Sequence, residues 1–139
     1  MIRKLLIIAS ILVFIPSETF SQSEQLVINI TQTSLPGQLT FENPKGSIKV
    51  TGYDGEVILV TSTLRFREAE KIVNNGMKRI DQNALDISAE VNGNNVSLLC
   101  RTIGKTVDFD IKVPRNFSLK LKSLDNGIVE IVNINGEIE

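Results

Sequence analysis

The residues whose types and spacing could support chemistry are two pairs of carboxylates. Asp108 and Asp110 stand two positions apart in an alternating segment, and Glu137 and Glu139 have the same spacing. Residues two apart on a strand project from the same face. Two such carboxylates can bind calcium or act as the acid and base of glycoside hydrolysis. The alternative, which we favour for Asp108 and Asp110 beside Lys112, is a solvated outer face of a strand.

Other reactive groups are scarce. The chain has no histidine and one cysteine, Cys100, so zinc, copper and iron lack their usual ligands and a thiol nucleophile lacks an imidazole base. Cys100 shares a face of a predicted strand with Val96 and Leu98, which predicts a buried, small apolar side chain. No phosphate loop, dinucleotide fingerprint or calcium-binding nonapeptide occurs. We therefore expect no catalytic residue, no metal site and no cofactor.

The first 21 residues predict a secretory signal peptide. A positively charged start is followed by an apolar run from Leu5 to Ile15 and then by small polar residues. The run is about half the roughly 20 residues that span a bilayer. The alternatives are an N-terminal membrane anchor and a buried first strand. Small side chains at Thr19 and Ser21 predict cleavage before Gln22. We expect export to the periplasm, the cell surface or the medium, with no membrane-spanning segment after cleavage.

Residues 22–139 are predicted to form one domain. They hold 13 basic and 15 acidic residues once Arg3, Lys4 and Glu18 are removed. A slightly acidic domain is a poor partner for nucleic acid or an anionic membrane surface, because both attract dense Lys and Arg. A single cysteine excludes an internal disulfide, so stability must come from packing and hydrogen bonds.

Most of this domain alternates apolar and polar residues with a period of two, which predicts strands with one buried face. Asn-Gly, Asp-Gly and Pro-Gly pairs separate the runs and predict tight turns. These features indicate a sandwich, a barrel or a β-solenoid. The residues expected to face the core are Leu26, Ile28, Ile30, Leu39, Phe41, Ile48, Val50, Val57, Leu59, Val107, Phe109, Ile111, Val113, Phe117, Leu119 and Leu121.

One segment has helical rather than strand spacing. Ala69, Ile72 and Val73 recur at helical intervals, and Asn75-Gly76 provides a C-cap. We expect a short helix over residues 67–74 that covers one end of the β core.

Two segments resemble each other without a gap. Gly46–Val57 aligns with Gly127–Ile138 at its glycines, its inward aliphatic positions and the acidic residue before the last aliphatic. Each segment reads as a strand, a glycine turn and a second strand, and such units must stack to bury their apolar faces. Two strands per coil would give a coil of about twenty residues, as in a β-helix. The chain stops at Glu139 inside an expected strand, so we expect further coils beyond it.

The glycine-and-aliphatic pattern at Leu39–Gly55, and again from Val113 through Asn135-Gly136, resembles the putative-adhesin family of exported bacterial proteins. The resemblance covers about residues 26–139. It implies the N-terminal part of a parallel β-solenoid with some antiparallel strands. It implies no catalytic or ligand residues.

These observations favour a non-catalytic exported protein of the cell envelope that presents an extended solenoid face. Its partners would be a cell-surface glycan, peptidoglycan or an envelope protein, and its last strand could pair with a second copy. The alternative is a carbohydrate-active β-helix, a lyase or hydrolase, whose site lies on coils that this chain lacks.

Overall fold

The described part of the chain is all β. The computed structural model describes residues 23–32, 34–65, 85–125 and 127–139, and none of them is helical. The predicted signal peptide, 1–21, and the predicted helix, 67–74, lie outside the described residues. The strands are β1 (Ser23–Asn29), β2 (Gln38–Asn43), β3 (Ile48–Tyr53), β4 (Val57–Arg65), β5 (Ile87–Asn92), β6 (Asn95–Cys100), β7 (Thr106–Pro114), β8 (Ser118–Ser123) and β9 (Val129–Val132).

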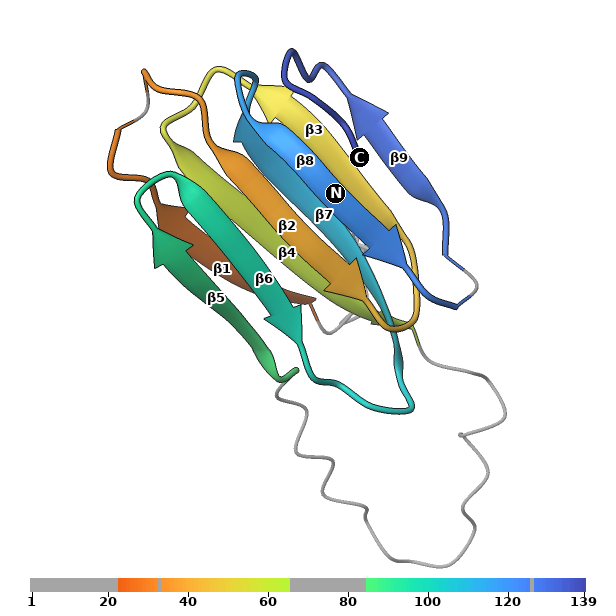
Figure 1. Ribbon diagram of the computed structural model, residues 1–139. Coiled ribbons are helices and arrows are strands. Elements are labelled where there is room, and N and C mark those ends of the chain that lie inside the picture. Colours follow the sequence, from red (N-terminus) through yellow and green to blue (C-terminus); the bar gives the residue numbers. More distant parts are fainter. Residues whose placement is uncertain (1–22, 33, 66–84, 126) are drawn as a thin grey trace, which may run out of the picture.

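The strands form two mixed sheets that do not close on themselves (Figure 1). The five-stranded sheet has the order β1-β4-β7-β3-β9, and the four-stranded sheet has the order β5-β6-β2-β8. Their inward side chains form one apolar core, in which the rings of Phe41 and Phe109 meet edge to face with centroids 4.7 Å apart. The predicted all-β class is confirmed, whereas the predicted β-solenoid is not shown: the strands form two mixed sheets.

Three strand pairs stack side by side within the two sheets. In each pair, β2–β3, β6–β7 and β8–β9, the chain crosses from the four-stranded to the five-stranded sheet. The β2–β3 pair is in the middle, and both of its strands run parallel to their neighbours. Ile48 lies opposite Phe109 on one side and Val129 on the other. This register places inward side chains of neighbouring strands beside one another.

The two similar segments are direct neighbours in this stack. Ile48 pairs with Val129 and Val50 pairs with Ile131, at the same offset as in the sequence alignment. The segments diverge after their glycine turns. After Gly55 the chain continues in the five-stranded sheet as β4, which pairs antiparallel with β1 and β7. After Gly136 the chain instead joins the four-stranded sheet, where Ile138 forms a β-bridge with Leu119.

Glycines allow the stacked turns to touch backbone to backbone. A Cβ at Gly127 would overlap the carbonyl oxygen of Gly46, and one at Gly136 would overlap that of Phe117. Gly46 itself has a φ of 121°, a conformation that other residues rarely adopt. The close approach of neighbouring turns therefore depends on the missing side chains.

A buried amide joins two of the stacked pairs. Asn43, at the end of β2, is 1% exposed, and its Nδ2 donates to the carbonyl oxygen of Val107 at 3.0 Å. Its Oδ1 accepts a bond from the backbone N–H of Lys45 at 3.4 Å. Because a buried polar group is costly unless it is paired, this contact favours the observed placement of β7 beside the β2–β3 turn.

The expected inward faces are confirmed for most strands, including all four positions on β7. On β4 the prediction was wrong by one residue. Ile58 and Val60 are buried, whereas Val57 and Leu59 lie on the outer face. The segment is apolar at four consecutive positions, so alternation could not decide between its faces. Pairing with β1 and β7 decides instead.

We predict that Gly127→Ala lowers the free energy of unfolding by about 3 kcal/mol, because the added methyl group would separate two stacked turns. Gly93→Ala is the matched control: its Cβ would meet open space, and only the φ of 61° is unfavourable, at about 1 kcal/mol. Urea unfolding followed by circular dichroism measures both changes. Equal losses in the two variants would contradict close stacking at Gly127.

Candidate interaction surface

The outer face of the five-stranded sheet carries a row of polar side chains in register. Thr61 on β4 lies opposite Asp110 on β7, Asp110 lies opposite Lys49 on β3, and Lys49 lies opposite Glu130 on β9. We call these four residues the charged row. Successive outward residues of paired strands are close enough to interact, and the Nζ of Lys49 is 3.8 Å from a carboxylate oxygen of Glu130.

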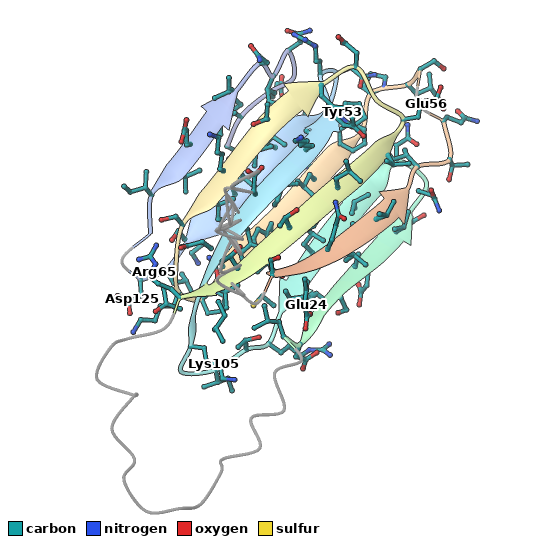
Figure 2. The ribbon with its side chains drawn as sticks, turned by 180° about the vertical axis from the view of Figure 1, so that it is seen from behind. Glu24, Tyr53, Glu56, Arg65, Lys105 and Asp125 are labelled. Atoms are coloured by element: carbon teal, nitrogen blue, oxygen red, sulfur yellow. The ribbon has the colours of Figure 1, made fainter. Side chains whose placement is uncertain are left out.

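Asp108 is held by several donors at one end of this face. The guanidinium of Arg65 contacts both of its carboxylate oxygens, at 2.6–3.0 Å, and the backbone N–H of Ser47 donates to Oδ1 at 2.9 Å. Figure 2 shows Arg65 at the end of β4. The ion pair ties β4 to β7, and the Ser47 bond ties both to the β2–β3 turn. Asp108 therefore has a structural role, and its charge is already balanced.

Asp110 differs from Asp108 in its surroundings. Both project from the outer face of β7, as predicted, but Asp110 is exposed and belongs to the charged row. Because Arg65 and Ser47 occupy the carboxylate of Asp108, the two carboxylates do not form a free pair for calcium or for acid–base work.

The second pair of carboxylates lies on the opposite side of the molecule. Ile138 bridges to the inward residue Leu119, so Glu137 and Glu139 project outward from the four-stranded sheet. A carboxylate oxygen of Glu139 lies 2.9 Å from the Nζ of Lys120 on that face. Packed sheets are separated by about 10 Å, so the two pairs cannot share one site. Across the described ranges, no group of three or more His, Cys, Asp or Glu is placed to hold a metal ion.

A shallow hollow of about 360 Å³ lies beside the charged row. Thr63, Arg65 and Glu130 contribute polar groups to it, and Ile128 contributes an apolar rim. Donors and acceptors alternate across this rigid sheet, an arrangement that suits hydrogen bonding to a polar partner. The sequence prediction missed Lys49, Arg65 and Glu130. Lys49 and Glu130 stand at equivalent places in the two similar segments, which was an available signal.

Among the described residues, Tyr53 is the aromatic side chain that this face leaves partly exposed. Phe41, Phe109 and Phe117 are buried in the core. The Tyr53 hydroxyl donates to the carbonyl oxygen of Val57 at 2.5 Å, which holds its ring against the β3–β4 turn. In the described part of this face, a sugar could therefore stack on Tyr53 alone.

Cys100 ends β6 on the predicted face, beside Val96 and Leu98, but it is half-buried rather than buried. It lines a second hollow of about 460 Å³ with residues 101–105 and the β2–β3 turn. Among the basic residues there, Lys45 is already paired with Asp125 at 3.3 Å. The described surroundings of Cys100 include no histidine or second thiol, since the chain has neither.

Comparison with known proteins gives one structural likeness. The fold is similar to the crystal structure of a putative cell adhesion protein from Clostridium sporogenes ATCC 15579, with a TM-score of 0.51 and 11% sequence identity. The match covers 85% of this chain and 56% of the other, so this chain spans about half the length of that protein. No protein-family model matches, and neither does any curated protein sequence. The likeness shows a related fold only. Within the described residues, no helix is long and apolar enough to cross a membrane.

We predict that Asp108→Asn lowers the free energy of unfolding by about 1 kcal/mol, because Arg65 loses its charged partner on a partly exposed face. Asp110→Asn, two residues away on the same face, should change it by no more than about 0.5 kcal/mol. Urea unfolding of both variants measures the difference. A larger loss for Asp110→Asn, or stabilisation of the wild type by millimolar calcium, would contradict the structural role of Asp108.

Proposed function

We propose that this chain is an exported, non-catalytic protein of the cell envelope, similar to adhesins, that binds a partner through the charged row and the hollow beside it. The observation that carries the proposal is the in-register row Thr61, Asp110, Lys49 and Glu130 on a rigid outer sheet. The predicted signal peptide and the likeness to a putative cell adhesion protein support an envelope location.

The proposed architecture is a short β-solenoid portion. Three strand pairs stack in parallel, and their turns touch through glycines. Stacked pairs produce flat outer sheets, and such surfaces bind extended partners without a deep pocket. The antiparallel strands β1, β4 and β5 flank the stack on one side.

The partner that best fits the charged row is a polar surface of an envelope protein. Lys49 and Arg65 supply donors, while Asp110 and Glu130 supply acceptors. A glycan or peptidoglycan would have to bind chiefly through hydrogen bonds, since Tyr53 is the single aromatic ring that the described face leaves partly exposed. Complementary charges at such a surface would chiefly set partner choice and association rate.

A non-catalytic role is supported by the way the carboxylates are used. Asp108 is engaged by Arg65, and the pair Glu137 and Glu139 lies on the other outer face. A glycosidase needs two carboxyl groups about 5–10 Å apart across one bond. Asp110 and Glu130 stand on either side of Lys49 and line the same hollow, so release of sugar from host polysaccharide is measured alongside binding.

We predict that Lys49→Glu weakens binding of the purified chain to intact cells of its host by about tenfold, because three acidic side chains would then stand together in the charged row. Lys49 is about half exposed, so the fold should tolerate the change. Cosedimentation measures binding to cells and, in parallel, to isolated peptidoglycan. Lys122→Glu on the opposite sheet is the matched control, since Lys122 is also exposed and also paired with a Glu, at 3.4 Å.

The proposal requires that the control keeps wild-type binding while Lys49→Glu loses it. If the chain binds isolated peptidoglycan but does not bind cells from which peptidoglycan has been removed, the partner is a glycan and not an envelope protein. Equal binding by both variants, or no binding by the wild type, would contradict a role for the charged row. Release of soluble sugar from host polysaccharide would contradict the non-catalytic assignment.

A further inference from the structure

The outer face of the five-stranded sheet is hollowed along β4. Figure 2 shows this face, with β4 between β1 and β7. Leu59 and Thr61 on β4 are half-buried and form the floor of the hollow. Its walls are exposed side chains, Gln25 on β1 and the pair Asp110 and Lys112 on β7. The space between them measures about 170 Å³, and we call this feature the β4 groove.

The β4 groove continues into the hollow beside the charged row. Asp110 lines both hollows, and the larger one follows β4 as far as Thr63 and Arg65. Together they extend from Leu59 to Arg65, a length of about 20 Å along a strand. The flanking strands β1 and β7 are two strand spacings apart, about 10 Å. These dimensions suit one extended chain that lies along β4.

The wall on β7 carries an acid and a base that are not neutralised within the described part of the chain. No ion pair or side-chain hydrogen bond among the described residues involves Asp110 or Lys112. Asp108 on the same strand, in contrast, is held by Arg65 at 2.6 Å. Because Asp110 and Lys112 are two residues apart on one strand, their Cα atoms are separated by about 7 Å. An occupant that satisfies both must offer a cation and an anion at the same separation.

The part of the groove beside Asp110 is polar. Asp110 lies opposite Thr61, and Thr61 lies opposite Gln25 on its other side. A carboxylate, a hydroxyl and an amide therefore stand in one line across the groove. This combination of acceptors suits an ammonium or guanidinium head group, which has several donors.

The part of the groove beside Lys112 has an apolar floor. Lys112 lies opposite Leu59, and Leu59 lies opposite Val27, which is 52% exposed. An acidic side chain with a methylene stem fits here, because the stem can cover Leu59 and Val27 while the carboxylate reaches Lys112.

We propose that the β4 groove binds an extended segment of a partner protein in which a basic and an acidic residue are two positions apart. Alternate side chains of an extended chain point to the same face and repeat every 7 Å or so, about the spacing of Asp110 and Lys112. The basic side chain pairs with Asp110, and the acidic side chain pairs with Lys112. A neutral glycan would leave both charges without a counterion, and a uniformly acidic one would be repelled by Asp110.

This inference rests on the proposed function, because it names the kind of segment that the same outer face binds. Fluorescence polarisation with three labelled peptides tests it. The peptides have capped ends and one uncharged Thr- and Ser-rich sequence, and they differ only in a charged pair: Lys-x-Glu, Lys-x-Lys or Glu-x-Glu. We expect the unmodified chain to bind the Lys-x-Glu peptide about fivefold more tightly than the other two, because only this pair meets both charges of the groove.

Variants of the two walls should change this preference in different ways. Lys112→Glu should favour the Lys-x-Lys peptide, since both charges on the β7 wall are then acidic. Gln25→Lys should weaken binding of the Lys-x-Glu peptide by about fivefold, because a second ammonium competes for Asp110 across β4. Lys122→Glu on the opposite sheet is the matched control. Lys122 is also exposed, and its replacement should keep the wild-type order.

Equal binding of the three peptides, no binding of any of them, or an unchanged order in Lys112→Glu would overturn the proposal. Displacement of the Lys-x-Glu peptide by neutral oligosaccharides of the host envelope would also overturn it, in favour of a glycan. A dimer of the free chain that the peptide dissociates would overturn it in favour of a second copy.

The proposed function has a separate readout in the binding of the chain to host cells. Binding to cells that depends on Lys49, without a preference among the peptides, would refute the extended segment alone. A clear preference for the Lys-x-Glu peptide, with binding to cells that does not depend on Lys49, would support the groove and refute the role of the charged row.

Discussion

The parallel stacking of three strand pairs is the constraint on which the rest of this structure depends. The middle pair, β2–β3, receives β6–β7 on one side and β8–β9 on the other, so every inward row of the core is assembled from distant parts of the chain. Turn glycines permit the necessary approach, since a side chain at Gly127 would overlap the turn at Gly46. Ion pairs on the outer faces follow the same register, Lys49 with Glu130 and Lys122 with Glu42. Lys45 and Asp125 form a further ion pair between the turns that follow β2 and β8.

Local sequence was a good guide to strands and a poor guide to their connections. Alternation correctly oriented β7, where an apolar residue stands at every second position from Val107 to Val113. It failed at Val57–Val60, where both faces are apolar and only the neighbouring strands decide. The alignment of Gly46–Val57 with Gly127–Ile138 anticipated the register of β3 with β9. It could not show that the chain behind Gly55 stays in the same sheet, since that path depends on pairing with β1 and β7.

The candidate surface illustrates the same limit. The outward direction of Asp108 and Asp110 could be predicted from their spacing, and it was confirmed. Their different roles could not be predicted from the sequence, because the partner of Asp108 is Arg65, which is 43 residues away in the chain. Two carboxylates that appear equivalent in the chain thus become one structural ion pair and one exposed member of the charged row. Glu137 and Glu139 project from the other sheet. The core between the sheets therefore prevents them from sharing a site with Asp108 and Asp110.

The outer face of the five-stranded sheet is the surface that the described strands offer to a partner. This face is polar, and its charged side chains are held in register by the strand pairing. The antiparallel strands β1, β4 and β5 flank the stacked pairs on one side. A stack of this kind binds through its flat outer faces rather than through a deep pocket.

Zero-length carbodiimide cross-linking, read by mass spectrometry on the monomer fraction, tests the stacking most directly. The account predicts links within one chain between Lys49 and Glu130, 3.8 Å apart, and between Lys122 and Glu42, 3.4 Å apart. These links join the middle strand pair to the terminal one in both sheets, across about 80 residues of sequence. Their absence, with Lys49 and Lys122 linked instead to acidic residues near them in the chain, would contradict the parallel stack.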